Sequence, residues 1–155
     1  MFYESTKLIS AENLILPTTT LTYGCYSSMF EGCTNLIAAP ELVATTLADY
    51  CYASMFEGCT NLTTAPELPT RTLTTYCYYR MFCDCTSLNY IKCLAEDKTA
   101  SNCTNYWVKN VADSGTFVEK SGAKWTTGVS GIPTGWVVED VRAIPEEFKD
   151  NPYYY

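Results

Sequence analysis

The sequence LTYGCYSSMFEGCTNLIAAPELVATT (residues 21–46) is followed at once by LADYCYASMFEGCTNLTTAPELPTRT (residues 47–72), and 17 of the 26 positions are identical. A third copy begins at Leu73 with LTTYCYYRMFCDCTSL. Self-similarity at a fixed period of about 20 to 50 residues is typical of a solenoid, in which each repeat buries its apolar face against its neighbours. The repeat therefore predicts a stack of similar units and leaves the function open.

The composition predicts one folded domain, because 47% of the 155 residues are hydrophobic and 17% are charged. A net charge of −7 argues against nucleic acid or an anionic membrane surface as a partner. We expect no membrane insertion by this segment, since no run approaches about 18 apolar residues. The opening MFYESTKLIS has no basic or apolar region of a secretory signal, so either the protein is not exported by that route or Met1 begins a piece of a longer chain.

The repeat divides the chain into four parts within a single domain. Residues 1–20 read as a partial N-terminal repeat, and residues 21–98 as three repeats of 26 residues. Residues 99–120 read as a degenerate fourth repeat, because Cys103 and Trp107 continue the apolar spacing of the third. Residues 121–155 are expected to form a C-terminal cap and tail.

Within each repeat the apolar residues recur in steps of four, four, four and three, as in Leu47, Cys51, Met55, Cys59 and Leu62. We interpret this spacing as one face of a helix. A capping box at Thr46 and a glycine at position 58 place the helix over residues 46–57, with counterparts one repeat to either side.

The segment after the glycine is predicted to be a turn followed by a very short strand. Pro40 and Pro66 lack the amide that a central ladder requires, so we expect strands over residues 36–39, 62–65 and 88–91. A polyproline-like coil without a ladder is the alternative. The sequence GTFVE (residues 115–119) predicts a further strand.

A motif of the form F-x-x-C-x-x-L occurs in all three repeats, beginning at Phe30, Phe56 and Phe82. With it, the repeat resembles the BspA-like bacterial surface family of leucine-rich repeat proteins. The resemblance implies an α/β solenoid, with short parallel strands inside and short helices outside. A β-rich cap would contain Trp125, Ile132, Trp136 and Val138. The chain departs from the family pattern at Ala39 and Ala65, where an aliphatic residue usually follows the strand leucine.

The inner face of the sheet is the predicted binding surface. If Leu88 and Ile91 point inward, then Tyr90 and Lys92 point to the concave face, in line with Thr64 and Thr116. Solenoids use such extended concave surfaces to bind partners.

The nine cysteines are expected to be mostly buried, unreactive thiols. Cys83 and Cys93 stand where the other repeats carry glutamate, which invites a disulfide between them. A metal site of Cys83, Cys85 and Cys93 with one further ligand is a remote alternative, so we expect neither metal nor cofactor. The glutamates at positions 31, 57, 41 and 67 form two columns that we interpret as solvated repeat positions.

Two functions fit these observations, and catalysis is disfavoured because the chain has no histidine. The first, implied by the family resemblance, is a protein- or glycan-binding module of a bacterial cell-surface or extracellular protein that takes part in adhesion. The second is a structural spacer, or an assembly subunit of a larger surface protein or phage-like particle. In that role a homo-oligomer could form through the aromatic tail, residues 153–155.

Overall fold

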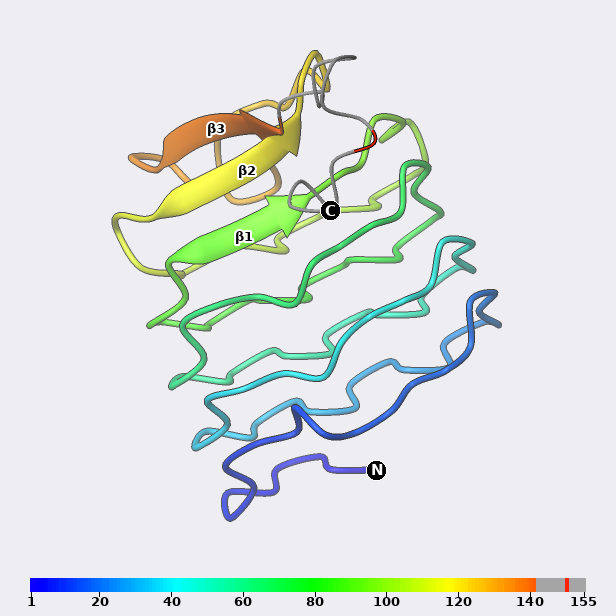
Figure 1. Cartoon of the computed structure of the whole chain (residues 1–155). Helices are drawn as coiled ribbons and strands as arrows, with labels where there is room; N and C mark the ends of the chain where they lie inside the picture. Colours follow the sequence, from blue (N-terminus) through cyan, green and yellow to red (C-terminus); the bar gives the residue numbers. More distant parts are fainter. Residues whose placement is uncertain (142–149, 151–155) are drawn as a thin grey trace.

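The computed structural model describes residues 1–141 and residue 150. The chain climbs in successive coils from the N-terminus, drawn in blue, to the last strand, drawn in orange (Figure 1). Residues one repeat apart lie side by side, since Thr20 pairs with Thr46 and Thr64 with Tyr90 in isolated parallel bridges. The repeat of the sequence is therefore also the spacing of neighbours in space.

Three short strands form one parallel sheet in the order β1-β2-β3. They are β1 (Tyr90–Cys93), β2 (Thr116–Lys120) and β3 (Val137–Val141). Tyr90 pairs with Thr116, and Thr116 in turn pairs with Val137. The strand expected within GTFVE is confirmed as β2.

The first two predicted strands shrink to single bridges. Ala38 pairs with Ser10 and Thr64 with Tyr90, in place of ladders over residues 36–39 and 62–65. Both segments run into a proline, which has no amide to donate. The third repeat has no proline at this point, and β1 forms there, beginning two residues later than the predicted strand over residues 88–91.

The predicted helices are wrong: no helix occurs in residues 1–141. The segment 46–57 and its counterparts are instead runs of tight turns, which lie side by side in neighbouring coils. We call residues 22–33, 48–59, 74–85 and 100–111 the turn ladder. Successive backbone amides donate alternately to the next coil and to their own coil. Tyr52 N–H donates to the Cys77 carbonyl of the next coil (3.1 Å), and Ala53 N–H donates to the Tyr50 carbonyl of its own coil (3.1 Å). Hydrogen bonds within each coil and between neighbouring coils thus pair the backbone amides and carbonyls of these segments without a helix.

Every fourth residue of the turn ladder has a positive φ. The series in the second repeat is Tyr50 (60°), Ser54 (54°) and Gly58 (73°). The same three places have positive φ in the other repeats, at residues 24, 28, 32, 76, 80, 84, 102, 106 and 110. A left-handed residue in each tight turn reverses the local bend, so the chain advances as a zigzag and does not wind into a helix.

The burial pattern has the same period of four. Cys51 and Tyr52 are buried, then Met55 and Phe56, then Cys59. A helix with 3.6 residues per turn would rotate such a stripe by about 40° for every four residues. A strict period of four therefore belongs to the turn ladder, and the steps in the sequence were the signal that distinguished it from a helix.

Stacked aromatic rings fill the compact core. Phe2, Phe30, Phe56 and Phe82 form one column with ring centroids 5.4, 5.4 and 5.7 Å apart and nearly parallel planes. Aromatic stacking across repeats is favoured because each ring meets its copy at the same height. A second column runs through Tyr26, Tyr52, Tyr78 and Trp107.

The C-terminal segment covers the last coil with two of the expected tryptophans. Trp125 stacks on Trp107 at 5.4 Å, and the buried Trp136 donates from Nε1 to the Ala112 carbonyl at 2.8 Å. Ile132 is buried, but Val138 in β3 is 46% exposed, so Val138 does not share the covering role. The tail residues 153–155, expected to make assembly contacts, lie outside the described residues.

Candidate functional site

Three of the residues predicted for the binding surface lie side by side on one face of the sheet. Thr64 pairs with Tyr90, and Tyr90 with Thr116. Tyr90 is partly exposed while its neighbour Ile91 is buried, so the tyrosine lies on the face opposite the core. The structure thus brings together the column that the spacing of the repeats predicted.

The fourth residue, Lys92, lies on the same face because side chains alternate along β1, and a change of register sets its neighbour in the preceding coil. Thr64 pairs with Tyr90, but Leu68 pairs with Cys93, one residue closer in sequence. The third repeat is therefore one residue shorter here than the second. As a result Lys92 lies beside Glu67 and forms an ion pair with it, Nζ to Oε2 3.1 Å. The glutamate column at positions 41 and 67 continues into a lysine.

An open groove with a volume of about 400 Å³ lies on the first two full repeats. It is lined by Glu12, residues 37–41 and residues 64–67, in the coils drawn from blue to cyan in Figure 1. Thr64 belongs both to this groove and to the Tyr90 column. The groove and the column therefore meet on one surface. No sequence pattern predicts this groove, because it depends on how neighbouring coils pack.

The disulfide suggested for Cys83 and Cys93 is not formed, since both thiols are free. The register change places Cys93 beside the core residue Leu68, and burial raises the pKa of the Cys93 thiol to about 12. Cys83 is also buried, in the turn ladder, and burial raises its pKa to about 11. The alignment with glutamate positions had predicted exposure for both, which is wrong.

The remaining thiols act mainly as core residues. Cys33, Cys59 and Cys85 form a column in which each Sγ donates to a backbone carbonyl of the preceding coil, at 2.9, 3.2 and 3.0 Å. The expectation of buried thiols is confirmed for eight of the nine cysteines, and Cys25 is the exposed exception. Cys25 belongs to the first full repeat.

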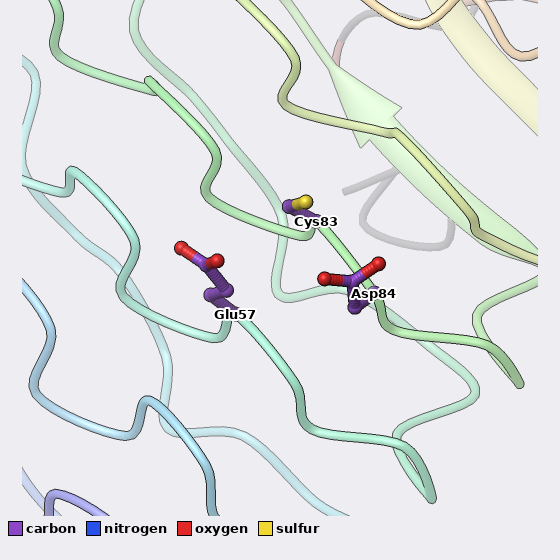
Figure 2. A group of neighbouring side chains, drawn as sticks. All are labelled: Glu57, Cys83 and Asp84. Atoms are coloured by element: carbon purple, nitrogen blue, oxygen red, sulfur yellow. The ribbon is translucent and has the colours of Figure 1, made fainter.

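Figure 2 shows Glu57, Cys83 and Asp84, whose side chains approach one another from adjacent coils. Their potential ligand atoms lie within 4.8 Å of one another. Arg80, however, donates from Nε to both Glu57 oxygens at 3.1 Å, and this bond raises the pKa of the guanidinium. Asp84 Oδ1 accepts from Asn110 at 2.6 Å. The arginine supplies the positive charge at this junction, which has the chemistry of a structural ion pair.

That cluster differs from the metal set considered from sequence. Of Cys83, Cys85 and Cys93, only Cys83 belongs to it, while Cys85 bonds to the Phe56 carbonyl. The new members follow from the repeat, because Cys83 occupies the place in its repeat that Glu57 holds in the preceding one.

A stack of tyrosines on the outside of the turn ladder was missed. Tyr23 packs on Tyr50 at 5.5 Å, and Tyr50 on Tyr76 at 4.7 Å. Tyr23 is 74% exposed. Tyr52 and Tyr78 are buried. Tyr50 and Tyr76 instead lie at left-handed positions, and Tyr23 directly precedes the left-handed Gly24.

No protein-family model matches the chain, and no curated protein and no solved structure matches it. In the part of the chain that the structure describes, no helix is long and apolar enough to cross a bilayer.

Proposed function

We propose that the chain is a non-enzymatic binding module with a leucine-rich-repeat-like solenoid fold, carried by a bacterial cell-surface or extracellular protein. Its ligand is a protein or a glycan. The observation that carries the proposal is the outward column of Thr64, Tyr90 and Thr116 beside an open groove. An extended surface built by several repeats is the usual binding site of a solenoid, and the F-x-x-C-x-x-L motif supports the family resemblance.

The absence of histidine from the sequence supports a non-catalytic role. In the described part of the chain, the Glu57, Cys83 and Asp84 cluster is held by Arg80 and Asn110. Its thiol, with a pKa near 11, is protonated at neutral pH and is a weak nucleophile.

A binding screen of the intact chain against glycans and extracellular-matrix proteins tests the proposal. The matched variant is Tyr90→Ala, which removes the aromatic side chain from the column while Ile91 and the core remain. We expect a specific hit that this variant loses, with an unchanged melting temperature. Silence of the folded protein across the screen would contradict the proposal.

A spacer or assembly subunit is the second candidate function, and β3 favours it. The three valines of this edge strand, Val137, Val138 and Val141, are 62%, 46% and 36% exposed. An exposed apolar edge strand is a template for pairing with another chain. Sizing chromatography tests this reading: a concentration-dependent dimer that Val138→Lys abolishes supports assembly, and a monomer at every concentration contradicts it.

A further inference from the structure

The groove on the first two full repeats is lined by apolar side chains and by three carboxylates, which we call the carboxylate rim. Ile37 is 56% exposed there, and the partly exposed Pro66 lines the same groove, whereas Pro40 is buried. Glu12, Glu41 and Glu67 line the same groove. An exposed isoleucine offers apolar contact area, and three carboxylates that line the same groove favour a ligand of positive charge.

The charges on this rim are only partly balanced within the chain. Glu67 pairs with Lys92 at 3.1 Å. Neither Glu12 nor Glu41 takes part in an ion pair among residues 1–141. Glu41 and Glu67 occupy equivalent places in adjacent repeats. A cation bound between them would be attracted by both, and Lys92 shows which kind of group this column of carboxylates accepts.

We propose that this groove binds an extended segment of a partner protein in which lysine or arginine alternates with an apolar residue. The inference rests on the proposed binding function and names the class of its partner. Successive side chains of an extended segment point to opposite sides. The lysine side chains of such a segment all point to one side, so their aliphatic stems can lie on Ile37 and Pro66 while their ammonium groups reach Glu41 and Glu12. The apolar side chains point away from the groove.

The test measures the fluorescence anisotropy of a labelled, capped peptide that alternates lysine and valine, titrated with the full chain. The matched peptides carry glutamate or glutamine in place of lysine. We expect saturable binding of the lysine peptide alone, strong at about 0.1 M salt and largely lost at about 1 M salt, because screening weakens exposed charge pairs. Absence of binding, or equal binding of the glutamine peptide, would overturn the inference.

Two variants of equal charge locate the site. Glu41→Gln removes one carboxylate from the rim, and Glu139→Gln removes one from the exposed strand β3, outside the groove. We expect Glu41→Gln to weaken binding roughly fivefold to tenfold, and Glu139→Gln to leave it within about twofold. Equal losses would mean attraction to the net charge of the chain and would overturn the groove as the site.

A third variant should strengthen the binding of the lysine peptide. Lys92→Ala releases Glu67 from its internal partner, so the lysine peptide should bind roughly threefold to fivefold more tightly. Unchanged or weaker binding would contradict the proposal. Should the screen yield a neutral glycan that Tyr90→Ala loses while the lysine peptide does not bind, the binding function stands and this inference fails. Absence of binding in both the screen and the peptide titration would contradict both the binding function and this inference.

Discussion

At the scale of single residues, the thiols divide by their surroundings. Cys25 is exposed, and the other eight cysteines are buried. Burial raises the pKa of Cys51 and of Cys59 to about 12, so almost none of either is thiolate near neutral pH. Alkylation of the native protein at mildly alkaline pH should therefore add one label, at Cys25, as shown by peptide mass spectrometry.

The control for that experiment is Cys25→Ala, which should leave the native protein unlabelled while unfolded protein takes up the reagent on its other cysteines. Rapid labelling of Cys51 or Cys59 in the native state would show that the core opens. The repeat alignment places Cys83 and Cys93 at glutamate positions, so labelling of these two thiols would support exposed positions and their protection would support the buried positions of the structure.

The same thiols make stability depend on alkaline pH. In the unfolded chain they ionise near a pKa of about 8.5, whereas in the fold Cys51, Cys59, Cys77 and Cys93 have pKa values raised by burial to about 12. Above the lower value the unfolded state has released protons that the native state keeps. Their contribution is therefore complete below about pH 8.5 and is lost as the pH rises toward 12.

Each such thiol should lower the free energy of unfolding by about 1.4 kcal/mol per pH unit in that window. Urea unfolding at a series of pH values measures the slope. Cys59→Ala removes one titrating group, and its slope should be shallower by that amount, although its stability at neutral pH is lower. A free energy of unfolding that stays constant through this pH window would show that the fold does not keep these thiols protonated.

At the scale of elements, the turn ladder sets which residues each position tolerates. Ser54 has φ of 54°, where a β-branched residue is strained. We expect Ser54→Val to reduce the free energy of unfolding by roughly 1 to 2 kcal/mol, and Ser54→Gly to change it by less than about 0.5 kcal/mol, because glycine accepts this φ.

Thr22→Val is the matched control for these two changes. Thr22 is exposed and its φ is not positive, so a β-branched apolar residue meets no backbone strain there. Equal costs for Val at positions 54 and 22 in urea unfolding would contradict the assignment of left-handed turns to every fourth residue.

The aromatic columns connect one element to the next. Phe56 is fully buried, with a ring on either side at 5.4 and 5.7 Å. Phe56→Ala should cost about 3 to 5 kcal/mol of unfolding free energy, since it leaves a cavity between two coils. Tyr23→Ala, at the exposed end of the outer stack, should cost far less. A cost below about 1 kcal/mol for Phe56→Ala would mean that the coils do not depend on this column.

Which segments are neighbours could be predicted from the sequence, but the type of secondary structure could not. The repeat fixed which residues are neighbours, so the Thr64, Tyr90 and Thr116 column was predicted correctly. The apolar steps predict a helix only if a period of four is equated with the 3.6 residues per turn of a helix, a difference that grows to about 120° over twelve residues. The left-handed serine, tyrosine and arginine positions gave no signal either, since propensity favours glycine or asparagine there.

At the scale of the whole molecule, each coil supplies carbonyl groups to the amides of the one before it, in every repeat alike. An additional copy of residues 47–72 inserted after Thr72 should therefore fold in register. We expect a higher urea midpoint, because the added repeat contributes a further interface between coils. We also expect the free energy of unfolding to fall more steeply with urea, because a longer chain exposes more surface when it unfolds. A copy of 25 residues is the control, and it should destabilise the protein, because the aromatic columns would no longer align.

The shortened register in the third repeat has a consequence for how such a protein changes over time. Copying a repeat preserves every neighbour, so duplication alone yields a uniform surface. A one-residue shift confined to part of one repeat instead changes which residues face each neighbour there, and the coils on either side keep their own spacing. Here the shift places Lys92 beside Glu67 in an otherwise acidic column and Cys93 beside the core residue Leu68, and the 26-residue spacing returns by Cys103. Duplication lengthens the molecule, and local shifts of register give each repeat its own chemistry.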